Sequence, residues 1–304
     1  MTEIERIIEQ RILPKSYFQE ETKCGFVVTE ARKKIWAIEI DLYLKLLKVC
    51  DKYGLRYWAE GGTLLGAVRH KGFIPWDDDF DVLMPREDYD KFIRLKDEFE
   101  HPYFLQTPYT DPESCYSYAK IRNSNTTGLV NLFKYQNINH GIWITVFPLD
   151  RWDEEGGEER YLQIRKLTTD CSTYMRMKNP NLSPKDKERV KAYHGDPIHD
   201  YEEIQRLASS CKNLQSKYVM NAVITLADYS RKLLKADDFS SAIPLEFEGV
   251  SLMAPVGYKN LLKMWFGDYL KFPPIEDRGK WHADVVFDAD IPYKDYLHMN
   301  GIVF

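Results

Sequence analysis

The chain has 304 residues, of which 44% are hydrophobic, so it is long enough to bury a substantial core in one large domain or two. Its formal net charge is −5 and its pI is near 5.9, which argues against a nucleic acid as the main partner. It contains no run of about eighteen apolar residues and its N-terminus is acidic, so we expect neither a transmembrane helix nor a signal peptide, and a cytoplasmic location.

Apolar periodicity predicts the helices and strands in chain order. Apolar residues at helical spacing from Ile35 to Tyr53 predict a helix that Gly54 ends. The remaining predicted elements are a strand at 55–59, a short helix at 64–68, a strand at 79–84, a helix at 88–98, a strand at 142–147, a helical stretch at 151–235, a hairpin at 245–253 and a helix at 258–266. Within the helical stretch, one apolar helix face is traced by Ile204, Leu207, Cys211, Leu214 and Tyr218.

Two carboxylates on the strand at 79–84 indicate a metal site. Side chains alternate along a strand, so Asp79 and Asp81 point the same way while Phe80 and Val82 point into the core. Two such carboxylates repel each other unless a hard cation lies between them, and Mg²⁺ or Mn²⁺ binds oxygen ligands while leaving positions for phosphate oxygens. The preceding Asp77 and Asp78 fit backbone capping or an added negative field better than metal ligation.

A glycine turn upstream of this strand indicates phosphate binding. Gly61, Gly62 and Thr63 follow the strand at 55–59 and lead into the short helix. Glycines at a strand-to-helix turn let backbone amides approach a phosphate, and the N-terminus of the helix favours the anion. Arg69 and Lys71 can neutralise further phosphate charge. A glycine pair alone marks only a turn, but this combination predicts metal-assisted phosphoryl transfer.

The segments carrying these residues resemble the LicD family of bacterial phosphocholine transferases, whose relatives include the fukutin-type ribitol-phosphate transferases. The resemblance covers most of the chain, in the blocks 60–90, 118–122, 140–150 and 265–282. It implies an α+β, nucleotidyltransferase-fold mixed β-sheet core flanked by helices, with a helical insertion. We expect a single domain of 1–304, with the core at about 25–150, the insertion at about 151–235, and a hairpin and helix that complete the site at about 236–304.

The resemblance also implies a reaction: a CDP-activated alcohol is split, and its phospho-alcohol moves to a hydroxyl of a glycan or lipid-linked glycan such as a teichoic acid or lipopolysaccharide precursor. Asp79 and Asp81 would hold the metal and act in catalysis. The residues expected to bind the donor and its phosphates are Gly61, Gly62, Thr63, Arg69, His70, Lys71, Lys120 and Arg122. Further substrate contacts are expected from Glu60, Trp76, Thr145, Asp150, Arg278 and His282. For Lys120, Arg122 and Arg69 the alternative interpretation is surface charge, and for His70 it is loop packing.

One position departs from the family pattern. The family block carries an acidic residue where this chain has Thr145, and a threonine cannot act as a general base or an anionic metal ligand. Asp150 lies beyond the predicted strand on no predictable face, and Glu60 can supply the missing charge or serve a structural role. We therefore keep two alternatives to the transferase: a nucleotidyltransferase that makes an NDP-activated compound, and a weakly active or non-catalytic nucleotide-binding relative.

Aromatic and cysteine residues bear on the partners and the compartment. Quaternary ammonium groups bind aromatic faces, so Trp58, Trp76, Trp143 and Trp281 favour CDP-choline as the donor, although core packing accounts for them as well. The five cysteines are scattered without a Cys-x-x-Cys pair, so we expect reduced thiols, no disulfide and no zinc site. Peripheral contact with the inner face of a membrane is compatible with a lipid-linked acceptor.

Overall fold

The computed structural model describes residues 2–224, 229, 232–279 and 284–304. Its helices are α1 Glu3–Glu9, α2 Glu30–Tyr53, α3 Gly61–His70, α4 Arg86–Phe92, α5 Gly157–Tyr174, α6 Pro184–Ala192, α7 Pro197–Ala208, α8 Tyr258–Phe266 and α9 Tyr293–Met299. Its strands are β1 Glu21–Lys23, β2 Phe26–Val28, β3 Trp58–Ala59, β4 Asp81–Pro85, β5 Tyr103–Gln106, β6 Ala119–Asn123, β7 Thr127–Val130, β8 Ile142–Trp152, β9 Tyr218–Met220, β10 Leu234–Lys235, β11 Ala242–Phe247, β12 Val250–Pro255 and β13 Val285–Asp288.

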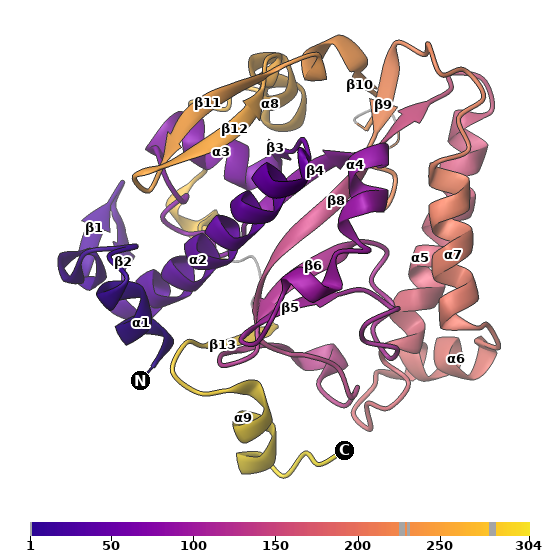
Figure 1. The fold of residues 1–304 in the computed structure, drawn as a ribbon. Helices are drawn as coiled ribbons and strands as arrows, with labels where there is room; N and C mark the ends of the chain where they lie inside the picture. The colour runs from indigo at the N-terminus through magenta and orange to yellow at the C-terminus, as the bar shows by residue number, and fades with distance from the viewer. Residues whose placement is uncertain (1, 225–228, 230–231, 280–283) are drawn as a thin grey trace.

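The long strand β8 is the centre of a mixed sheet (Figure 1). It pairs in parallel with β4 on one side and antiparallel with β6 and then β9 on the other, while β3 borders β4, β5 borders β6 and β10 borders β9. Helices and mixed sheet together confirm the predicted α+β class.

Alternating residues of the sheet fill two separate cores. Val82, Ile144 and Val146 enter the core that α2 covers, whereas Leu83 and Phe147 enter a second core formed with α5 and α7. The alternation follows from the two-residue period of a strand. Figure 1 shows α5, α6 and α7 together on one side of the sheet, and α3, α8 and the β11–β12 hairpin at another edge. Helix α2 therefore covers one face of the sheet. The other face carries the residues of the second core and also polar side chains.

The predicted helix ending at Gly54, the hairpin at 245–253 and the helix at 258–266 are confirmed as α2, β11–β12 and α8. Thr29 caps α2 with its side chain, and Gly54 ends it with a left-handed conformation at φ 65°, which glycine adopts without strain. Gly249, at φ 81°, lies in the hairpin turn. The sequence and the structure agree at these elements because the apolar periodicity and the residues that end or turn each element lie within the element itself or next to it.

Several predicted boundaries are wrong. The predicted helix at 64–68 extends over 61–70, the strand at 55–59 has only two residues, and the helix at 88–98 ends at Phe92. Strand β8 continues through Pro148 to Trp152; it pairs with β6 only up to Val146 and with β9 only from Asp150. Proline, which has no N–H to donate, therefore occupies the gap between the two antiparallel partners.

The apolar helix face predicted through residue 218 is also wrong in its second half. Helix α7 ends at Ala208, so Ile204 and Leu207 are buried on it, whereas Leu214 is 73% exposed in a loop and Tyr218 lies on β9. The described residues of the stretch 151–235 form the helices α5, α6 and α7, but they also contribute β9 and β10 to the sheet.

The expectation of reduced cysteines is corrected at one pair. Cys115, which precedes β6, and Cys171 on α5 form a disulfide, and both are buried. They are separated by 56 residues, and spacing alone gave no reason to pair them. Among the described residues, Cys24, Cys50 and Cys211 remain free thiols.

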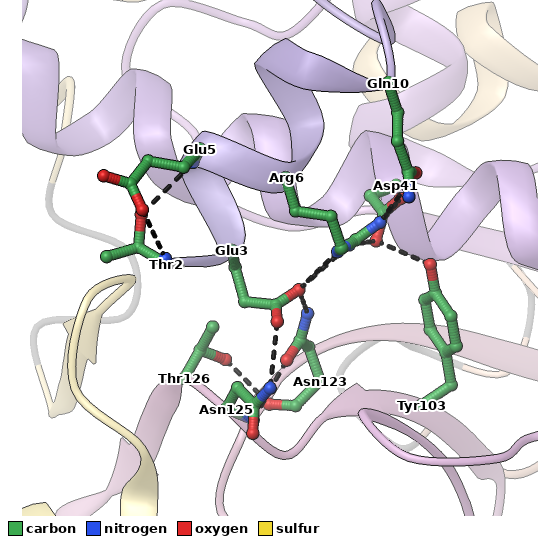
Figure 2. A network of polar contacts seen from close by, with 10 residues as sticks. All are labelled: Thr2, Glu3, Glu5, Arg6, Gln10, Asp41, Tyr103, Asn123, Asn125 and Thr126. Carbon is green, nitrogen blue, oxygen red and sulfur yellow. Dashed lines mark hydrogen bonds and ion pairs between the residues drawn. The ribbon is translucent and has the colours of Figure 1, made fainter.

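A polar network fastens α1 to the sheet (Figure 2). Asn123 at the end of β6 donates a 2.9 Å hydrogen bond to Glu3, and Arg6 forms an ion pair with Asp41 of α2. The Tyr103 hydroxyl on β5 donates to the same Asp41 carboxylate at 3.0 Å. Asp41 is buried, so these partners compensate a charge that would otherwise destabilise the core.

No described helix is both long enough and apolar enough to cross a bilayer.

Candidate active site

Three neighbouring strands align polar side chains on the face that α2 does not cover. Asp81 of β4 lies opposite Thr145 of β8, and Thr145 lies opposite Lys120 of β6. Residues paired across strands share a face, so the three side chains form a row on the same face as Phe147. The row places Asp81, from the segment predicted to bind metal, beside Thr145 and Lys120. The sequence connected these two residues with the site only through the family resemblance.

Helix α3 begins at the end of this row. The Glu60 N–H donates to the Asp81 carbonyl oxygen at 3.1 Å, and the Asp81 N–H donates to Thr63 Oγ1 at 2.9 Å. Thr63, which we expected to contact the donor, is buried and fixes the start of β4 against the first turn of α3. The first backbone amides of α3, including those of the glycine pair, therefore lie beside Asp81, where a phosphate would meet the positive end of the helix.

Gly62 lets two carboxylates approach the helix closely. A Cβ atom at Gly62 would lie 2.8 Å from Asp77 Oδ2 and 3.8 Å from Asp79 Oδ1. Asp79 precedes β4 rather than lying on it, so the argument that Asp79 and Asp81 share a face of one strand is wrong. The loop instead folds the Asp79 carboxylate towards the N-terminus of α3, next to the strand that carries Asp81.

Side chains of helix α2 hold the acidic loop, residues 77–79, in place. Arg32 Nη1 and Trp36 Nε1 donate to the Asp77 carbonyl oxygen at 2.8 and 2.9 Å, and Arg32 also pairs with Asp78 at 3.4 Å. Glu39, one turn further along α2, is 1% exposed, and its Oε2 atom has no hydrogen-bond partner. Burial, followed by the charge of Asp79 and its acidic neighbours, raises the pKa of Glu39 well above its usual value. Sequence reasoning missed Glu39 because it sits within an apolar helix.

A lysine from the distant segment after β9 also lies near the site. Lys232 is 9% exposed, and its charge acts on Glu60. Burial raises the pKa of Glu60 to about 7; Lys232 opposes this rise and Asp79 adds to it. Burial lowers the pKa of Lys232 to about 8, and Glu60 opposes that change. The structure thus joins Glu60, Lys232 and Asp79 electrostatically, and no sequence signal singled out Lys232.

Lys120 is enclosed by aromatic rings. Its Nζ atom lies 4.0 Å from the centroid of the Tyr116 ring and 4.0 Å from that of Trp143. The side chain is buried, and burial lowers the pKa of Lys120 well below its usual value; Arg122 adds to this effect and Asp81 opposes it. The interpretation of Lys120 as surface charge is therefore wrong. Two rings hold its ammonium group on the face that carries Asp81.

Arg122 is likewise buried rather than a surface charge. It is 1% exposed and donates hydrogen bonds of 2.6 Å to Gln106 Oε1 and to the Gly141 carbonyl oxygen. Its guanidinium lies 4.9 Å from the Trp143 ring centroid. These contacts secure the Gly141 backbone and the ring beside Lys120, so a contact between Arg122 and a donor stays a prediction.

The basic residues after the glycine pair lie at the opposite end of α3. Arg69, His70, Trp76 and Arg278 gather around Phe272. Gly61 and Arg69 are eight residues apart on one helix, which corresponds to about 12 Å. Lys71 departs from this group: its side chain is 73% exposed and pairs with Glu246 of β11. His282 lies outside the described residues.

Asp150 has a structural partner. Its two carboxylate oxygens accept bonds of 2.6 and 3.0 Å from Arg86 of α4, and it is 1% exposed on β8. The expectation that Asp150 lies beyond the strand is wrong because β8 continues to Trp152. This bidentate pair uses the carboxylate to join α4 to the sheet.

The acidic groups beside α3 would need further ligands to hold a divalent cation. Among the described residues, no group of three or more His, Cys, Asp or Glu side chains is arranged to hold a metal ion alone. However, the charges of Asp79 and Asp81 add to the effect of burial in raising the pKa of the Glu39 carboxyl, so the field of these acidic groups is negative at Glu39. Hard oxygen ligands in such a field fit Mg²⁺ or Mn²⁺, provided that substrate phosphates complete the coordination.

Known proteins resemble this chain across the same region. Residues 54–170 match the family model described as LicD/FKTN/FKRP, nucleotidyltransferase domain. The lipopolysaccharide cholinephosphotransferase LicD of Haemophilus influenzae is 28% identical over 258 residues, which cover 79% of this chain and 91% of that protein. The ribitol 5-phosphate transferase FKRP of Homo sapiens is 55% identical over 48 residues, which cover 16% of this chain and 10% of that protein.

The mixed sheet, with its acidic strand beside the N-terminus of a helix, defines a nucleotidyltransferase-type domain. Residues 54–170 match the LicD family model, and the curated relatives support a LicD-type phosphotransferase.

Proposed function

We propose that this enzyme moves a phospho-alcohol, with phosphocholine favoured, from a CDP-activated donor to a hydroxyl of a cell-surface glycan precursor in a reaction that requires Mg²⁺ or Mn²⁺. The observation that carries the proposal is the row Asp81–Thr145–Lys120 beside Asp79 and the N-terminus of α3. It combines carboxylates for a cation, an ammonium group and the amides of a helix N-terminus on one face, which is what a diphosphate donor requires. We assign the enzyme to the cytoplasm, where CDP-alcohols and lipid-linked precursors can meet.

Different residues are assigned to binding of the donor and of the cation. Amides at the start of α3 and the Lys120 ammonium bind and orient the donor diphosphate, while Asp79 and Asp81 hold the cation, which neutralises phosphate charge when bound. The acceptor hydroxyl oxygen forms a bond to the phosphorus of the phospho-alcohol, and the bond from that phosphorus to the bridging oxygen breaks. CMP leaves with the bridging oxygen, and the hydroxyl proton passes to solvent. Such a transfer depends more on alignment and charge than on covalent catalysis.

The names of the relatives support choline as the donor alcohol. The protein from Haemophilus influenzae that matches most of this chain is named a cholinephosphotransferase, whereas the human relative named for ribitol 5-phosphate matches a short segment. Because the cholinephosphotransferase matches a much larger share of this chain, choline is favoured over ribitol as the donor alcohol. Either alcohol uses the same diphosphate and metal chemistry.

The test measures donor binding and turnover together. Thermal shifts with CDP-choline, CDP-ribitol, CDP-glycerol and CTP, each with and without Mg²⁺, should give a metal-dependent rise for one CDP-alcohol. Asp79→Asn and Asp81→Asn should abolish that rise and the release of CMP. The matched control is Asp295→Asn, an exposed carboxylate on α9, which should leave both unchanged. Unchanged CMP release by the Asp81 variant would refute the assignment.

A second candidate function is nucleotide binding without turnover. It rests on Thr145, which is 4% exposed and lies between Asp81 and Lys120 where the family pattern has a carboxylate. In that case the wild-type protein should bind a CDP-alcohol and release no CMP, and Thr145→Asp should create turnover. Turnover by the wild-type protein would eliminate this candidate.

A further inference from the structure

Two arginines from distant parts of the chain face the same pair of aromatic rings. The Arg69 guanidinium carbon lies 5.7 Å from the ring centroid of Trp76 and 5.1 Å from that of Phe272. The corresponding distances for Arg278 are 4.5 and 5.6 Å. Both guanidiniums are therefore held over a shared aromatic surface, which fixes their positions.

Both arginines are anchored by uncharged acceptors. Arg69 Nη1 donates to the Tyr269 carbonyl oxygen at 3.0 Å, and Arg69 Nε donates to His70 Nε2 at 2.9 Å. Arg278 donates to the carbonyl oxygens of Pro273 at 3.0 Å and Cys24 at 2.7 Å. In the part of the chain that the structure describes, neither guanidinium forms an ion pair with a carboxylate, and the hydrogen bonds of both arginines are donated by Nε and Nη1.

Among the described residues, the two positive charges therefore act on each other without a carboxylate to offset them. Burial lowers the pKa of Arg69, and Arg278 lowers it further. His70 is neutral here, because burial, followed by the charge of Arg69, lowers its pKa to about 4. Two preorganised guanidiniums that have no carboxylate partner among the described residues match the charge of a phosphate.

Exposed apolar side chains flank this arginine pair. Leu270 is 63% exposed and sits next to Tyr269, whose carbonyl oxygen anchors Arg69. Ile275 is 69% exposed, and its carbonyl oxygen accepts a hydrogen bond from the Arg278 N–H at 3.2 Å. The Phe272 ring, stacked on His70 at 5.7 Å, fastens the segment to α3. The apolar side chains are thus held outward from an anchored segment.

We propose that Arg69 and Arg278, with Leu270 and Ile275 beside them, form a second anion site that binds the phosphate of an amphiphilic, lipid-linked acceptor. Guanidiniums supply the complement to the phosphate, and the exposed apolar side chains enter the lipid around it. Its role as an acceptor site rests on the proposed transferase function. The site lies about 12 Å along α3 from the glycine amides, so it is separate from the donor diphosphate.

The experiment measures co-sedimentation with vesicles of phosphatidylcholine alone, or of phosphatidylcholine containing phosphatidic acid, and calorimetric titration with inorganic phosphate. We expect binding to the phosphatidic acid vesicles that weakens at least tenfold in Arg69→Gln/Arg278→Gln and severalfold in Leu270→Ser/Ile275→Ser. The matched controls are Arg206→Gln, an exposed arginine on α7, and Leu214→Ser, an exposed loop leucine. Neither control should change binding.

Vesicle binding that is equal in wild type and in the double arginine variant would overturn the proposal. Binding of inorganic phosphate without binding of phosphatidic acid vesicles would overturn it as well, because a free phosphate would then be the ligand. Metal-dependent binding of the CDP-alcohol, measured on Leu270→Ser/Ile275→Ser, should persist. Loss of vesicle binding with intact donor binding therefore separates failure of this inference from failure of the proposed function.

Discussion

Three glycines on α3 provide a graded test of the site. Replacing Gly62 by alanine should lower kcat/KM by about 10- to 100-fold, because misplacing a reacting group by about 1 Å has effects of this size. The new Cβ would lie 2.8 Å from Asp77 Oδ2, so this carboxylate must move, and Asp79 is next to it. Stability should change by less than about 1 kcal/mol, because alanine favours the helix by about 1 kcal/mol and offsets the crowding.

The same change at the other two glycines should affect stability. A Cβ at Gly66 meets the carbonyl oxygen of Gly72, which is backbone and cannot rotate away, so we expect a loss of about 1–3 kcal/mol. Gly61 has φ +49° and open space around its Cβ position, so alanine there should cost about 1–2 kcal/mol through backbone strain.

The assay combines CMP release with urea unfolding of all three variants. The reasoning predicts that Gly62→Ala separates activity from stability, while Gly66→Ala mainly reduces stability. Full activity in Gly62→Ala, or a stability loss there as large as in Gly66→Ala, would refute this reasoning. It would show that the placement of the Asp77 and Asp79 carboxylates does not require a residue without a side chain at position 62.

Three further predictions follow from buried groups. Arg86→Met should lower the free energy of unfolding by about 3–5 kcal/mol, measured in urea, because it leaves the Asp150 carboxylate buried without its partner. Tyr116→Leu should raise the donor KM about 3- to 30-fold, and Tyr116→Phe should retain most of the affinity, because the ring rather than the hydroxyl holds the Lys120 ammonium. Burial lowers the pKa of His140 to about 3, so its neutral form is favoured in the fold, and its contribution to stability is complete above the unfolded pKa of about 6.5 and falls as the pH drops towards 3. Between pH 7 and 5 this amounts to about 2 kcal/mol, which should be missing from the pH dependence of His140→Gln.

Sequence reasoning was effective where the signal was local. Helix α2, the β11–β12 hairpin and α8 each carry their periodicity and end signals within a few residues, and all three are confirmed. The acidic pair was proposed because aspartates flanked by apolar residues are conspicuous in a sequence, and its role as a metal site stays a prediction. Its geometry was not found, because the loop before β4 depends on contacts from Arg32 and Trp36 that lie far away in the chain.

Residues that act through tertiary contacts gave no such signal. Lys232 is one of many lysines in a charged stretch, and only folding brings its charge to Glu60. Arg69 seemed close to the glycine pair in sequence, but the rise of α3 separates them. Asp150 was misjudged because the proline before it argued for the end of a strand, whereas β8 has different partners on either side of that proline.

The neighbours of β3 have a consequence for biosynthesis. This two-residue strand pairs with β4 soon after it emerges from the ribosome, but it also packs against β12, which is made much later. Pairing of β4 with β8 likewise cannot occur until the residues between them have been synthesised. Lys232, whose charge acts on Glu60, is synthesised after β8. Closing such long loops costs entropy before any contact compensates for it, so we expect slow folding. The nascent chain should expose the polar row of the active site until translation has passed β12, and during that interval it should depend most on chaperones.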